Sequence, residues 1–133
     1  MSYLTAVVNN ACTWTIGGEL DVSAGAAVSA LRGDNMTAVK TGTGQYTITL
    51  KNSGNMQLVE LLGREANFAG ATRPATALGV CLDTVTQNAT TGDIAIVITT
   101  LANPTSGAAT DGTAAVTIAF STVIRTCKMG APL

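Results

Sequence analysis

The residue types that most often carry enzyme chemistry are sparse in this chain. The 133-residue sequence has no histidine, which removes the commonest general base and the usual middle member of a nucleophilic triad. Most of its carboxylates stand in turns or among polar neighbours, where a solvated carboxylate is the ordinary state. Glu60 and Glu65 are five residues apart, so they would face opposite sides of a regular strand. We therefore expect no enzyme activity and no catalytic residue.

The sequence also lacks the usual signatures of a metal or cofactor site. Cys12, Cys81 and Cys127 show no CxxC spacing, so neither a zinc site nor a disulfide framework is indicated, and we expect small buried side chains in a reducing compartment. Gly42 and Gly44 lack the third glycine of a phosphate-binding loop and lie between two strand-like runs. We expect no metal, no cofactor and no small-molecule substrate.

Charge is the most informative feature of the composition. Charged residues make up 11% of the chain and hydrophobic residues 47%, and the formal net charge is -1. The basic residues are scattered singly, which argues against direct nucleic-acid binding. No apolar run approaches the roughly 18 residues of a membrane span, and the first residues do not resemble a secretion signal, so we expect synthesis in the cytoplasm and no membrane partner. A surface so poor in charge favours coverage by other subunits, hence a homo-oligomer.

The strongest structural signal lies in residues 36–51. Two alternating runs rich in Thr, Val, Ile and Tyr flank the Gly-containing residues 41–44, which predicts a β-hairpin. Tyr46, Ile48 and Leu50 recur with period two, so we expect them to face a core.

The remaining segments predict further strands. Residues 56–66 are ambiguous: their apolar spacing fits a helix, while Gly63 favours a bulged strand, which we prefer because strands surround it. Gly17, Gly18 and residues 19–25 indicate a loop, and residues 93–100, apolar on both faces, indicate a central strand covered on both sides. Other strands are expected at residues 3–8, 12–16, 26–31, 77–87 and 114–126, with a long surface loop at 101–113.

Together these segments predict an all-β fold, a single-domain antiparallel β-sandwich or barrel. Residues 1–25 form an N-terminal strand or arm, residues 26–127 the sandwich core, and residues 128–133 a C-terminal tail. Trp14, the only tryptophan, either fills the core or anchors a partner, since tryptophan is enriched in both settings.

The order of these segments resembles small virion proteins of tailed bacteriophages, the head decoration or cement proteins that are encoded near the major capsid protein. The resemblance spans residues 26–125. It is carried by the runs MTAVK and GTGQYTITL at residues 36–50, the apolar run at 58–62, DIAIVI at 93–98, and AVTIAFS at 115–121.

This resemblance implies a non-enzymatic structural protein that decorates and stabilises the outer capsid. It would be made in the host cytoplasm and act on the virion surface as a homo-oligomer, a trimer in preference to a dimer, with the major capsid protein as partner. Residues outside the expected core are the interface candidates: Trp14 and Ile16 in the arm, Asn103, Pro104 and Asp111 in the loop at 102–112, and Lys128, Met129 and Leu133 in the tail.

Other roles share this fold class. A tail, baseplate or fibre-head module would show ring or fibre-end symmetry. The main shell protein of a small virus would be expected to carry a basic arm or terminal helices for packing a genome. A carbohydrate-binding module usually displays exposed aromatic side chains, and the five aromatic residues of this chain barely furnish a core.

Overall fold

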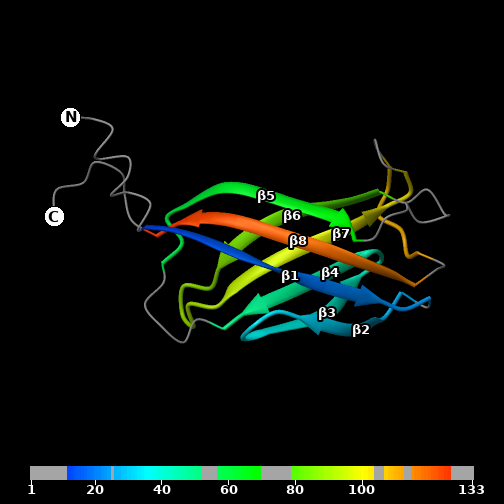
Figure 1. Cartoon of the computed structure of the whole chain (residues 1–133), viewed down its shortest axis with the longest axis horizontal. Coiled ribbons are helices and arrows are strands. Elements are labelled where there is room, and N and C mark those ends of the chain that lie inside the picture. The colour runs from blue at the N-terminus through cyan, green and yellow to red at the C-terminus, as the bar shows by residue number, and fades with distance from the viewer. Residues whose placement is uncertain are drawn as a thin grey trace, which may run out of the picture.

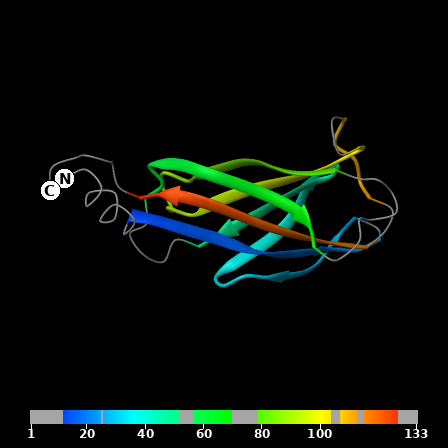
Figure 2. The ribbon, with the colours of Figure 1, turned by 45° about the horizontal axis from the view of Figure 1, so that its top comes forward.

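The computed structural model describes residues 12–24, 26–51, 57–69, 79–103, 107–112 and 115–126. These residues form eight β-strands in two four-stranded antiparallel sheets, which pack face to face as a sandwich (Figure 1, Figure 2). The all-β prediction is thus confirmed, with a sandwich as the architecture. No helix in these ranges has the length and apolarity needed to cross a membrane.

The first sheet has the order β2-β1-β8-β5 and the second β3-β4-β7-β6. The strands are β1 (Thr13–Val22), β2 (Val28–Arg32), β3 (Met36–Gly42), β4 (Gln45–Leu50), β5 (Glu60–Phe68), β6 (Gly79–Gln87), β7 (Ile94–Leu101) and β8 (Val116–Arg125). The first and the last strand pair with each other at the centre of the first sheet along their full length, from Thr13 with Arg125 to Val22 with Val116.

The hairpin predicted at residues 36–51 is confirmed as β3 and β4. Tyr46 and Ile48 are fully buried, as the period-two pattern requires. Tyr46 is the largest of the fully buried side chains, and its hydroxyl donates a hydrogen bond to the carbonyl oxygen of Ala26 at 3.0 Å. Burial, the main cause, raises the pKa of Tyr46.

The strand preferred for residues 56–66 is confirmed over residues 60–66, which belong to β5; residues 57–59 precede the strand, and Met56 lies outside the described residues. The register of β5 against β8 shifts between Leu61 and Gly63, so the glycine does mark a bulge. The bulge corrects one expectation about carboxylates, because Glu60 pairs with Arg125 and Glu65 with Ser121, two residues on the same face of β8. Glu60 and Glu65 therefore share one face of the sheet, about 13 Å apart along the strand.

The loop predicted at Gly17, Gly18 and residues 19–25 is wrong for the part that lies in β1. Glycine is needed at position 18 because a Cβ there would approach the carbonyl oxygen of Arg32 to 2.4 Å and the Phe120 ring to 3.1 Å. Close approach of neighbouring groups explains a glycine inside a strand. The predicted arm at residues 1–25 therefore includes a central strand of the sandwich, and residues 1–11 lie outside the described residues.

Strand β7 is central, as expected, but among the described residues its outer face is only partly covered, with Thr99 buried there. Ile94, Ile96 and Ile98 are fully buried between the sheets. Ala95 and Val97, on the opposite face of the strand, are partly exposed.

The cysteines also differ from expectation. Cys12 is disulfide-bonded, Cys81 is a free, partly buried thiol, and Cys127 lies outside the described residues. Spacings in the sequence could not reveal this bond, because pairing depends on how the strands come together.

Candidate interaction surfaces

The middle of the outer face of the second sheet carries uncharged side chains, with Asp83 beside Thr99 and the Lys51–Asp93 ion pair at its margins. Its side chains alternate with the buried residues of β4 and β7, so they point away from the core. Strand pairing aligns them in rows across the sheet, for example Val39 beside Thr47, Thr47 beside Val97, and Val97 beside Thr84. We call this surface the threonine face: Thr37, Val39 and Thr41 of β3, Thr47 and Thr49 of β4, Thr84 and Thr86 of β6, and Ala95 and Val97 of β7.

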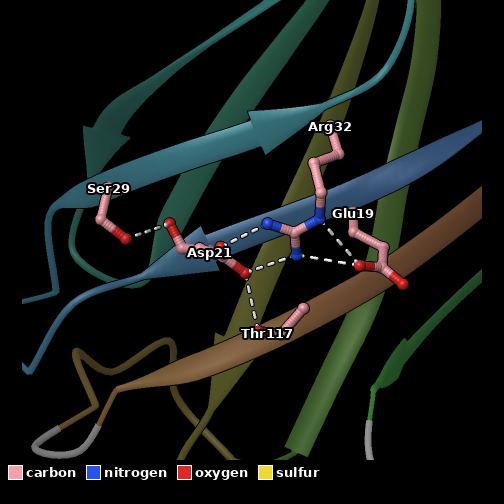
Figure 3. A network of polar contacts seen from close by, with 5 residues as sticks. All are labelled: Glu19, Asp21, Ser29, Arg32 and Thr117. Atoms are coloured by element: carbon pink, nitrogen blue, oxygen red, sulfur yellow. Dashed lines mark hydrogen bonds and ion pairs between the residues drawn. The ribbon is translucent and has the colours of Figure 1, made fainter.

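The outer face of the first sheet has the opposite character. Figure 3 shows a network in which Arg32 of β2 binds two carboxylates of β1. The guanidinium donates to both oxygens of Asp21, at 2.5 and 2.8 Å, and to Glu19 at 2.8 and 3.0 Å. Thr117 of β8 donates to Asp21 at 2.7 Å, so the network ties three neighbouring strands together.

This network also fixes the protonation of its members. The hydrogen bond from Arg32, followed by that from Thr117, lowers the pKa of Asp21 from 3.8 to about 2. The bonds to Asp21 and Glu19 raise the pKa of Arg32. At the far end of the same face, Arg125 of β8 forms an ion pair with Glu60 of β5. The first outer face therefore carries an ion-pair network across β1 and β2, whereas the second has its charged groups at the margins of the threonine face.

A shallow, open depression lies where the edge strands β5 and β6 adjoin. Among the described residues that line it, Cys81 is the one with a nucleophilic side chain. The thiol lies 3.1 Å from Asp83 Oδ1, while Thr99 donates to the other carboxylate oxygen. Burial, and then the hydrogen bond with Asp83, raise the pKa of Cys81 to about 11. The thiol is therefore protonated at neutral pH and is a poor nucleophile.

Arg64 lies beside Cys81 and donates to the carbonyl oxygen of Asp83 at 3.0 Å, which joins the two sheets across their edge. Within the described ranges, no group of three or more His, Cys, Asp or Glu residues is placed to hold a metal ion.

The loop after β7 is folded against the β3–β4 turn. Thr110 and Thr100 are joined by a backbone hydrogen bond at 2.9 Å, and the Thr100 amide donates to the carbonyl oxygen of Gly44 at 2.8 Å. Asp111 accepts a hydrogen bond from the Gly44 amide at 2.7 Å and pairs with Lys40 at 2.8 Å. The bond from Lys40, and then that from Gly44, lower the pKa of Asp111.

The structure places the predicted interface residues in different environments. Trp14 is 49% exposed, so it does not fill the core, whereas Ile16 is 6% exposed and belongs to the core. Asp111 contacts its own chain through Lys40 and Gly44, and Asn103 is an exposed residue two positions after the end of β7. Four candidates lie outside the described residues: Pro104, Lys128, Met129 and Leu133.

Sequence reasoning expected a charge-poor surface covered by other subunits but did not identify the threonine face. Its signal was present in the alternating threonines at 37, 41, 47, 49, 84 and 86, yet only the pairing of β4 with β7 brings these threonines onto one surface.

A β-sandwich hosts many unrelated functions, so the fold by itself does not assign one. Comparisons of the chain with protein-family models, with curated proteins and with solved structures found no match.

Proposed function

We propose that this chain is a non-enzymatic structural protein of a virion, which binds the outer surface of the capsid as a homo-oligomer and stabilises the shell. The observation that carries the proposal is the threonine face. None of its side chains is ionisable, and the charged groups at its margins, Asp83 and the Lys51–Asp93 pair, already have partners within the chain, so a protein partner can cover it with little desolvation penalty. Its methyl groups supply apolar area, and its hydroxyls can pair with polar groups of the partner.

The contrast between the two outer faces supports an orientation. The first sheet carries the Arg32 network and the ion pair between Arg125 and Glu60, and such charged groups are best left in water. The threonine face would then lie against the capsid, and the charged face would point to solvent. This arrangement removes the uncharged surface from water and leaves the virion surface hydrated.

The assignment to a capsid comes from the resemblance of the β3–β4 hairpin and the later strands to phage decoration proteins. In such a role the protein acts by contact area. Each copy contributes a modest contact, and attachment of several linked copies multiplies the total affinity. A trimer located where capsid proteins meet would hold neighbouring shell subunits together.

The test is to isolate virus particles that contain the protein and to image them by electron cryomicroscopy. We expect density for the sandwich on the outer capsid, with the second sheet toward the shell. Density at a tail, baseplate or fibre would contradict the capsid position, and a protein that never cosediments with particles would contradict the virion role.

A matched pair of variants tests the orientation in a binding assay with the same particles after the native protein has been removed. Thr84→Glu places a carboxylate on the threonine face, and we expect at least about tenfold weaker attachment because that charge would be buried without a partner. Thr15→Glu is the control, since Thr15 is an exposed threonine on the outer face of β1. Equal binding by both variants would refute the proposed orientation.

A further inference from the structure

Large exposed hydrophobic side chains gather at one end of the sandwich. Among the described residues, four large hydrophobic side chains are exposed, and three of them lie near the start of β1 or of β5: Trp14 at 49%, Val59 at 39% and Leu62 at 41%. We call these three residues the end patch. The fourth, Val39 at 56%, belongs to the threonine face.

Strand register places the backbone of the end patch at one end of the first sheet. Trp14 pairs with Ile124 of β8 on one side, and Leu61, the neighbour of Leu62, pairs with the same residue on the other side. The backbones of Trp14 and Leu61 are therefore about 10 Å apart, which is two strand spacings. The amide of Val59 donates to the carbonyl oxygen of Arg125 at 2.9 Å. Figure 1 shows the starts of β1 and β5 beside the end of β8.

Two ion pairs among the described residues lie at this end. Arg125 forms an ion pair with Glu60. On the second sheet, Lys51 pairs with Asp93 at 3.1 Å. This second pair lies at the same end, because the amide of Leu58 donates to the side chain of Gln87 at 2.8 Å and Gln87 pairs with Ile94, the residue after Asp93.

An apolar centre with a polar rim is the usual anatomy of a protein–protein contact. Because the members of these two pairs neutralise each other, they add little repulsion between two copies, and tryptophan is among the side chains most enriched in residues that dominate binding energy. The chain also continues from β1 into residues 1–11 and from β8 into residues 127–133 at this end, so both segments start within reach of a bound copy.

We infer that the end patch is the surface through which copies of this chain bind one another. The inference deepens the proposed function, on which it rests for the homo-oligomer, by separating two surfaces. The end patch holds copies together, and the threonine face binds the capsid. Closed symmetric association through this end leaves every threonine face available to the shell.

The experiment measures the mass of the purified full chain by light scattering over a concentration series. We expect the wild-type protein to exceed the monomer mass of 13.4 kDa, and Trp14→Ser to raise the dissociation constant by about 30-fold, a typical loss for a tryptophan at the centre of a contact. Val39→Ser is the matched control, because it removes an equally exposed hydrophobic side chain from the threonine face. Its mass profile should equal that of the wild type.

Far-UV circular dichroism establishes that each variant is folded. If Trp14→Ser fails to fold, the double variant Val59→Ser, Leu62→Ser tests the same surface. The wild-type protein gives a second readout, since its single tryptophan should shift its emission to longer wavelength as dilution separates the copies.

A wild-type chain that stays monomeric at high concentration, or variants of the end patch that associate as the wild type does, would overturn the inference. A monomer that still binds particles would leave the proposed function intact. An oligomer that does not bind particles would instead overturn the proposed function alone.

Discussion

Replacement of Gly44 by alanine should weaken the fold far more than replacement of Gly42, although the two glycines stand in the same turn. Gly44 has φ of +62°, a left-handed conformation that costs a residue with a side chain about 1 kcal/mol. A Cβ at this position would also lie 2.5 Å from the Thr110 carbonyl oxygen and 2.8 Å from that of Thr100. Both obstacles are backbone atoms, so the loop itself would have to move.

That movement would disturb the hydrogen bonds that hold the loop to the turn. The amide of Thr100 donates to Gly44, and the amide of Thr110 donates to Thr100. If both are weakened at about 1 kcal/mol each, the total loss for Gly44→Ala is about 3 kcal/mol. For a domain of this size, such a loss lowers the melting temperature by about 10 °C.

The assay is urea denaturation followed by circular dichroism, with Gly42→Ala as the control. A Cβ at Gly42 would meet the side-chain oxygen of Gln45 at 3.1 Å, and that side chain can rotate away, so we expect a loss below about 1 kcal/mol. Gly44→Asn separates the two causes, because asparagine tolerates the left-handed conformation but still carries a Cβ. It should retain most of the loss. Equal stability of the Gly44→Ala and Gly42→Ala variants would refute the reasoning.

Three further outcomes follow from burial and charge. The pKa of Asp21 is about 2 in the folded protein, below its ordinary value of 3.8. Its carboxylate therefore stabilises the fold above about pH 4, and this contribution is lost as the pH falls toward 2. Asp21→Asn should flatten the dependence of the urea midpoint on pH between these two values. Ile96→Ala should cost about 3 kcal/mol of unfolding free energy, because Ile96 is fully buried, whereas Val97→Ala on the outer face should cost less than about 1 kcal/mol in the same measurement. With a pKa of about 11, Cys81 should react with iodoacetamide at pH 8 about a hundredfold more slowly in the native protein than in urea, as judged by mass spectrometry of its peptide; equal rates would contradict the burial of this thiol.

Local patterns predicted much of the fold. The turn glycines of residues 41–44 and the alternation of Tyr46 and Ile48 were enough to place the β3–β4 hairpin, and Gly63 marked the bulge of β5. The same reasoning failed at Gly17 and Gly18, because a glycine that makes room for a neighbouring backbone looks, in sequence, like a glycine that ends a strand. Only the approach of Arg32 and Phe120 distinguishes the two cases.

The candidate surfaces depended on contacts between distant parts of the chain, and so most of them were not predictable. Trp14 and Ile16 have the same parity in β1, yet one is exposed and the other buried, because they differ in how far they lie from the end of the sandwich. Asp111 was expected to contact a partner, but it contacts Lys40, some seventy residues earlier in the chain. Pairing of β4 with β7 assembles the threonine face, and no local pattern encodes that pairing.

The central position of β8 has a consequence for biosynthesis. Strands β1 and β5 are joined only through β8, so the first sheet cannot close until the ribosome has released residues 116–125. Until then β1 and β5 present bare edges that invite pairing with other chains, and the long sequence separation makes the closing step slow. Nascent copies made close together on one messenger RNA would therefore face their greatest risk of aggregation just before synthesis of this strand is complete.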